Sequence, residues 1–144
     1  MKRKLLHLLC ASIILFLHSA CKSTPLEAAA NTLNRDLDLV RSPYQYTPTP
    51  EKDRLIRVLR KMPVGETAAD ATLRADVERT IAQKLGSAPS IVEIRIFETQ
   101  PDLRREVWVA EKEFKRYAFD VILRPHRTGV SFTVEGPILI EGAL

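Results

Sequence analysis

The sequence predicts an α+β fold, in which N-terminal helices pack on one face of an antiparallel β-meander of four or five strands. Two observations carry this prediction. Before residue 86 the apolar residues recur every three or four positions, as on one face of a helix, and from residue 91 they alternate with polar residues, as on a half-buried strand. Helices that precede a run of consecutive strands are typical of the α+β class.

A first helix is predicted from Thr24 to about Arg41. Thr24 is a suitable N-cap, Pro25 suits the first helical position, and Glu27 stands three residues after the cap, where it completes a capping box. One stripe of apolar side chains follows at Leu26, Ala30, Leu33, Leu37 and Val40. We expect this stripe to pack on the domain's own core, with a partner helix or the bilayer surface as the alternative.

Residues 42–50 hold three prolines and no periodic pattern, which predicts an extended connector. A second helix is predicted over 50–62. Its apolar residues are Leu55, Ile56, Val58, Leu59 and Met62. The opposite side carries Arg54, Arg57 and Lys61, which form either a solvated face or a contact for lipid headgroups or an acidic partner.

A third helix is predicted from Thr67 to Leu85. Asp70, three residues after Thr67, makes a capping-box variant, and Gly86 ends the helix. The apolar side comprises Ala69, Leu73, Val77, Ile81 and Leu85. This side is expected to cover the sheet that follows.

Four strands are predicted: one at 91–98, a second that begins with 107–109, a third at 117–123 and a fourth at 130–134. Residues 138–140 either extend the last strand beyond Gly136-Pro137 or form a fifth one. Residues 110–116 are rich in Glu and Lys, which leaves open a short helix, a charged hairpin or a long bent strand. Trp108, the lone tryptophan, is expected in the core, and the alternative is an aromatic patch that binds a partner or a glycan.

The N-terminus has the three parts of a secretory leader. Three basic residues, Lys2, Arg3 and Lys4, precede a mostly apolar run from Leu5 to Leu17. This run is shorter than the roughly 20 apolar residues that a membrane-spanning helix needs. The pattern therefore favours a cleaved leader over an uncleaved anchor.

The run from His18 to Cys21 resembles the lipobox of bacterial lipoproteins, with His18 in place of the usual leucine. The resemblance covers residues 1–22 alone. It implies cleavage before Cys21 by signal peptidase II and lipidation of the Cys21 thiol, with a further acyl chain such as palmitate on its amino group. Two or three chains hold a protein firmly on a membrane. Lys22 resembles an outer-membrane sorting signal, whereas a cut after Ala20 by signal peptidase I would leave a soluble secreted protein.

These features divide the chain into a signal peptide at 1–20, an N-terminal helix with a Pro-rich connector at 21–50, and an α+β domain at 51–144. Three of the 22 basic residues lie in the leader and none of the 18 acidic ones does, so 19 basic and 18 acidic residues remain. A domain so close to neutrality has no basic footprint for a nucleic acid.

Removal of the leader also removes Cys10 and two of the three histidines, and leaves His126 and a lipid-capped Cys21. These are too few ligands for a Cys/His metal site, so no metal, cofactor or disulfide is expected.

No catalytic residue is predicted, because the sequence has no phosphate-binding glycine loop and no serine in a nucleophile elbow. We predict a non-enzymatic, lipid-anchored module of the outer membrane, facing the periplasm, that binds or scaffolds an envelope protein as an accessory subunit. The alternatives are a soluble secreted or periplasmic domain that binds a small ligand between helices and sheet, and an envelope hydrolase that uses Glu111, Glu113 or His126.

Overall fold

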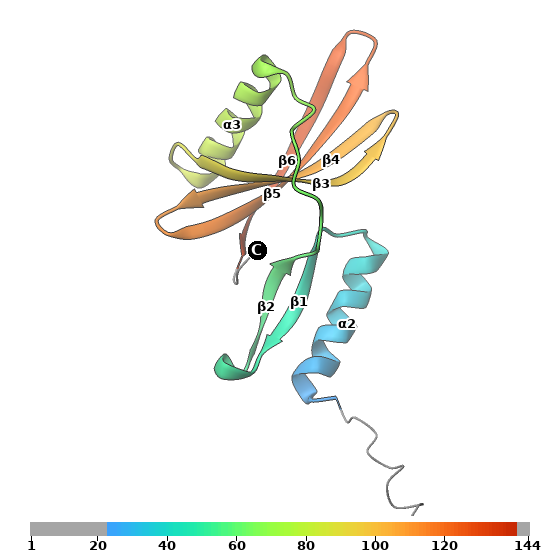
Figure 1. Ribbon diagram of the computed structural model, residues 1–144, viewed down its shortest axis with the longest axis vertical. Coiled ribbons are helices and arrows are strands. Elements are labelled where there is room, and N and C mark those ends of the chain that lie inside the picture. The colour runs from blue at the N-terminus through green and yellow to red at the C-terminus, as the bar shows by residue number, and fades with distance from the viewer. Residues whose placement is uncertain (1–22, 141–144) are drawn as a thin grey trace, which may run out of the picture.

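The computed structural model describes residues 23–140, and over these residues the protein is α+β, with two α-helices and two antiparallel sheets (Figure 1). The elements are α2 (Pro25–Leu39), β1 (Tyr44–Thr49), the 3-10 helix η1 (Pro50–Lys52), β2 (Arg54–Leu59), α3 (Ala71–Leu85), β3 (Ser90–Gln100), β4 (Leu103–Lys112), β5 (Lys115–His126) and β6 (Gly129–Ile140). The predicted α+β class is confirmed.

The larger sheet has four strands in the order β3-β4-β5-β6, and β1 and β2 form a separate two-stranded sheet. Alternate side chains of a strand point to opposite faces. Trp108 lies opposite Phe119 on one face of the larger sheet, whereas Val107 and Val109 belong to a second apolar cluster on the other face. The centre of the sheet is therefore buried on both sides.

Helix α3 covers the face that carries Trp108. Its buried side chains are Val77, Ile81 and Leu85, as the periodicity predicts. Gly86 ends the helix in the left-handed region, with φ 70°, which glycine adopts without steric cost. The helix begins at Ala71, because the Asp70 side chain caps it by accepting a hydrogen bond from the Leu73 amide at 2.8 Å. The predicted start at Thr67 is therefore wrong.

Thr67 instead helps to hold a buried carboxylate. Glu106, on β4, is fully buried. Its Oε2 accepts hydrogen bonds from Thr67 Oγ1 at 2.7 Å and Trp108 Nε1 at 2.9 Å. Its Oε1 accepts from the Ala68 amide and from Arg104 Nε, both at 2.8 Å. Four donors thus satisfy a group that is costly to bury without partners, and they tie the loop before α3 to the sheet.

The other face of the sheet contacts the hairpin of β1 and β2, where the sequence predicted a connector and a helix. The predicted helix over 50–62 is wrong, because β2 pairs along its length with β1, from Tyr44↔Leu59 to Thr49↔Arg54. The six residues of β2 are too few for their apolar pattern to distinguish a helix from a strand. The β-branched Ile56 and Val58 favour a strand when a partner strand is present.

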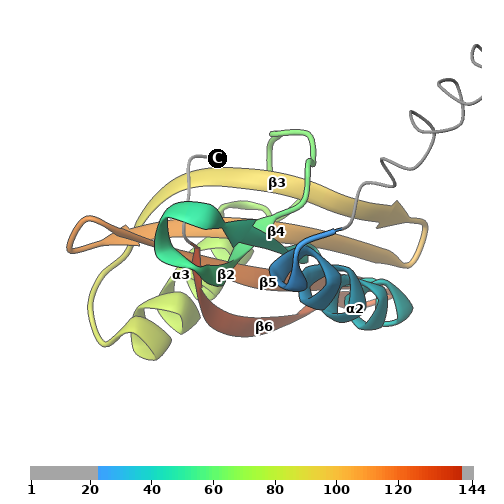
Figure 2. The same ribbon diagram turned by 90° about the horizontal axis from the view of Figure 1, so that it is seen from below.

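Helix α2 is confirmed with its capping box, in which Thr24 and Glu27 each bond the other's backbone amide. It packs on the hairpin. The Asn34 side chain donates to the Tyr46 carbonyl at 2.9 Å and accepts from the Tyr46 amide at 2.6 Å, as a neighbouring strand would. Figures 1 and 2 show α2 beside the hairpin and α3 beside the larger sheet. The expectation that all N-terminal helices pack on one face of the sheet is not confirmed.

Two segments left open by the sequence are settled. Residues 110–116 form a charged hairpin between β4 and β5, which turns at Glu113 and Phe114 with φ 52° and 61°. Residues 138–140 extend β6 beyond Gly136-Pro137, where the peptide bond is cis.

We expect Glu106→Gln to lower the free energy of unfolding by about 3 kcal/mol, because the amide NH2 group would face two donors in place of an acceptor. Urea unfolding followed by Trp108 fluorescence measures this change. Glu111→Gln is the control: Glu111 is part-exposed and lies 3.6 Å from Arg116, so its loss should cost about 0.5 kcal/mol or less. Equal effects of the two substitutions would contradict the role given to Glu106.

Gly136→Ala should be more destabilising than Gly129→Ala by about 2 kcal/mol. Both glycines have positive φ, 121° and 145°, but a Cβ at Gly136 would lie 2.9 Å from the Ala118 carbonyl oxygen and 3.0 Å from Phe119 Cδ1, whereas a Cβ at Gly129 meets nothing within 4 Å. Thermal denaturation of the two variants compares them directly. A similar loss in both would mean that backbone conformation alone matters at these positions.

Candidate functional site

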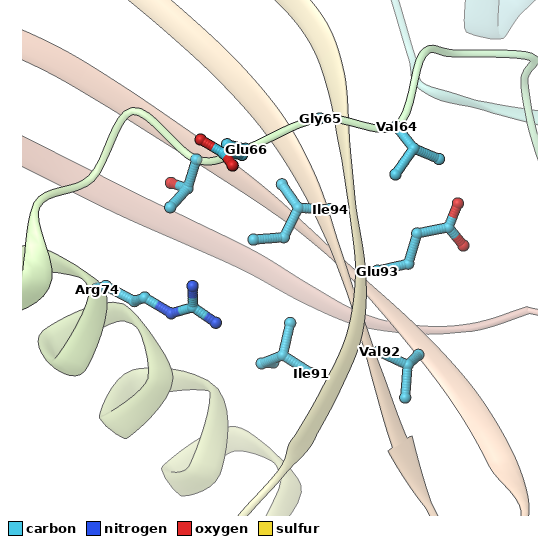
Figure 3. Close-up of a pocket in the computed structure, with 9 residues that line it drawn as sticks. Val64, Gly65, Glu66, Arg74, Ile91, Val92, Glu93 and Ile94 are labelled. Atoms are coloured by element: carbon cyan, nitrogen blue, oxygen red, sulfur yellow. The ribbon is translucent and has the colours of Figure 1, made fainter.

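A hollow of about 430 Å³ runs along the outer edge of β3. Its lining comes from the loop before α3, from α3 and from the first half of β3, and comprises Val64, Gly65, Glu66, Thr67, Arg74, Ile91, Val92, Glu93 and Ile94. We call it the edge groove (Figure 3).

One wall of the edge groove is a short extended segment at 63–65 that pairs with β3. The Gly65 amide donates to the Ile94 carbonyl at 3.0 Å, and the Ile96 amide donates to the Pro63 carbonyl at 2.9 Å. Gly65 permits this approach, since a Cβ there would lie 3.0 Å from Ile96 Cγ1. Within residues 23–140, this bridge alone covers the outer edge of β3. The edge from Ser90 to Glu93 is open.

The side chains of the edge groove lie on both sides of β3. Figure 3 shows Ile91 and Ile94 pointing toward Arg74 of α3, while Val92 and Glu93 point the other way. Consecutive residues share a side here because the register shifts between Ile91 and Glu93, as at a β-bulge. The groove thus offers an unpaired strand edge with contacts above and below its plane.

Apolar surface is exposed along the groove. Val64 is 65% exposed and Val92 45% exposed. Arg74 is held in place: its Nε donates to Glu78 Oε1 at 2.9 Å, and its guanidinium lies 5.9 Å from the centroid of the Trp108 ring.

The residues that the sequence suggested as a partner or headgroup contact are not brought together. The basic stripe depended on a helix, and in strand β2 the side chains of Arg54 and Arg57 point to opposite faces. Arg57 lies 5.3 Å from the Tyr46 ring centroid and donates to the Tyr46 hydroxyl at 2.7 Å. Lys61 is exposed beyond the strand. Trp108 is fully buried, so it offers no surface to a partner.

The residues of the hydrolase alternative are also dispersed. Glu113 lies in the turn between β4 and β5. Glu111 lies on β4, 3.6 Å from Arg116 of β5. His126 Nε2 and Ser131 Oγ are 2.7 Å apart at the exposed end of the β5–β6 hairpin. No carboxylate among residues 23–140 hydrogen-bonds to this histidine, so the pair lacks the orienting acid of a catalytic triad.

Residues 23–140 contain no group of three His, Cys, Asp or Glu side chains that could hold a metal ion. Within the same residues, no helix combines the length and the apolar character that crossing a bilayer requires. Cys21, the predicted site of lipid attachment, lies outside the described residues.

The edge groove was not among the sites predicted from the sequence. Pro63-Val64-Gly65 nevertheless combines a proline that favours extended backbone with a glycine that allows another chain to approach closely. That combination is the one local signal for a short edge-covering segment.

No protein-family model, curated protein or solved structure matches this chain. Its class therefore rests on its own geometry, which is that of a small α+β domain with an open sheet edge.

Proposed function

We propose that this protein is a lipid-anchored module of the bacterial envelope that binds an extended segment of a partner protein at the edge groove. The observation that carries the proposal is the open edge of β3 beside the paired segment 63–65. An exposed edge presents unpaired backbone donors and acceptors, which another extended chain can satisfy.

The binding mode follows from the geometry of the groove. A partner segment would continue the line of residues 63–65 and pair with Ser90 to Glu93. Its alternate side chains would then meet Ile91 and Arg74 on one side and Val64 and Val92 on the other. Backbone hydrogen bonds would supply affinity, and the apolar contacts would select side chains.

The position of the proposed anchor supports a role at the membrane surface. Three residues separate Cys21 from Pro25, the first residue of α2. Fully extended, a link of this length spans about 13 Å. A domain held so close to the bilayer meets membrane-associated partners at high effective concentration, so modest intrinsic affinity suffices for an accessory subunit. Lys22 supports the outer membrane, facing the periplasm, as the location.

The second candidate is a soluble secreted or periplasmic domain that binds a small ligand. A separate pocket between the α2–hairpin unit and the larger sheet favours it. The two candidates differ in what happens at Cys21.

Cys21→Ser should move the mature protein from the detergent phase to the aqueous phase in a detergent phase separation, or leave an uncut precursor, because lipid can no longer attach. Cys10→Ser is the matched control and should behave like the wild type, since Cys10 would leave with the leader. Mass spectrometry of the mature chain should show a diacylglycerol on Cys21. A wild-type protein found wholly in the aqueous phase would rule out the anchor and favour the secreted candidate.

A photoreactive amino acid at Val92 should crosslink to an envelope protein in native membranes, whereas the same group at Val130 should not. The two valines are closely matched, since they lie on opposite edge strands and are 45% and 44% exposed. Val64→Lys should abolish the adduct from position 92, because a charge would enter the apolar side of the groove. Equal adducts from both positions, or an adduct that survives Val64→Lys, would overturn the edge groove as the binding site.

A further inference from the structure

A second hollow, of about 270 Å³, lies between the α2–hairpin unit and the face of the larger sheet opposite α3. Its lining comprises Leu37, Val40, Ser42, Pro43, Tyr44, Arg57, Arg105, Asp120, Glu135 and Ile138. We call it the junction pocket. It shares no lining residue with the edge groove.

Three polar atoms on residues that line the junction pocket are buried without a partner. Asp120 is 4% exposed, and its Oδ2 accepts from Arg105 Nη2 at 2.5 Å while its Oδ1 has no hydrogen-bond partner among the described residues. The hydroxyl of Tyr44, which is 6% exposed, and the Nε of Arg105 have none either. Buried groups of this kind are rare in folded proteins, because each unmade bond costs about 1–3 kcal/mol.

These atoms are one acceptor and two donors. Burial, and secondarily the Asp120 carboxylate, raises the pKa of Tyr44 above its ordinary value, so the phenol remains neutral and keeps a proton to donate. Arg105 Nε–H donates, and Asp120 Oδ1 accepts. A ligand hydroxyl can donate to the carboxylate and accept from a donor at the same time.

The charges that line the pocket are balanced. Arg57 and Arg105 face Asp120 and Glu135, so neither an anion nor a cation has a net partner there. Taking a charged ligand out of water without such a partner is costly. The balance favours a neutral ligand with several hydroxyl groups.

The other walls are apolar and come from Leu37, Val40, Pro43 and Ile138. Such walls suit the C–H surface of a ring. The volume is just below the usual range for small-molecule sites, about 300–1,000 Å³, and therefore fits a compact ligand.

From these observations we propose that the junction pocket binds a neutral sugar residue, with its hydroxyl groups on Asp120, Tyr44 and Arg105. This goes beyond the proposed binding of a partner segment and does not depend on it, because the two sites share no residue.

The test uses the full chain in detergent micelles and ligand-observed NMR, with glucose, galactose and mannose as probes. Glucosamine and glucuronate keep the pyranose ring and add a positive or a negative charge. We expect at least one neutral sugar to bind more tightly than both charged analogues. Maltotriose tests whether the ligand is a free sugar or the end of a longer glycan. It should bind at least as well as glucose only if the end of a glycan chain enters the pocket.

Tyr44→Phe is the decisive variant. It removes a hydroxyl that no group within residues 23–140 bonds, so thermal stability should stay the same or rise, while the dissociation constant for the neutral sugar should rise about tenfold. Tyr117→Phe, at a partly buried tyrosine outside the pocket, should change neither the affinity nor the neutral-sugar preference. Val64→Lys, in the edge groove, should also leave sugar binding intact.

Three results would overturn the inference: no binding of any neutral sugar, preference for glucosamine or glucuronate, or binding that Tyr44→Phe leaves unchanged. Because the readout is sugar affinity rather than crosslinking, failure here leaves the edge groove unaffected. The reverse also holds, since loss of the Val92 adduct would not alter the sugar titration.

Discussion

The buried carboxylate of Glu106 is the interaction on which the arrangement of the larger sheet depends. It sits in the middle of β4, where an unpaired charge would be strongly destabilising, and its four donors come from the same strand and from the loop before α3. Satisfying the carboxylate therefore requires the loop to lie across the sheet. The same loop connects residues 63–65, which pair with β3, to the Asp70 cap of α3.

A second layer of polar contacts joins the α2–hairpin unit to the opposite face of the sheet. Arg105 contacts Asp120, stacks 4.7 Å from the Phe97 ring centroid and donates to the Arg41 carbonyl at 3.2 Å. Arg41 in turn pairs with Glu98 at 3.0 Å. Apolar contacts around Tyr44 and Leu59 complete the junction. The side chains of the two units do not fill the space between them, and the junction pocket remains there with polar groups at its floor.

The two hollows have different physical origins. The edge groove exists because a sheet of four strands has two edges, and the loop held by Glu106 covers only part of one of them. The junction pocket exists because two units with their own secondary structure meet face to face. An open edge suits recognition of an extended chain, whereas a concave pocket with a polar floor suits a small molecule. One small domain therefore offers two hollows of different shape and chemistry.

What the sequence by itself determined lies in short-range chemistry. The capping box at Thr24 and Glu27, the glycine that ends α3 and the alternation along β3 to β6 depend on neighbours a few positions away, so they could be predicted. The hairpin at 110–116 was only one of three alternatives, because neither Glu113 nor Phe114, which form its turn, usually adopts positive φ. Only the tertiary structure decided that residues 54–59 form a strand. Their apolar pattern fits both a helix and a strand, and pairing with β1 and packing on the second apolar face of the sheet select the strand. The tertiary structure also decided which acidic residues within 23–140 are buried. Glu106 and Asp120 look like solvated charges in the sequence, and only donors brought from distant positions make their burial favourable.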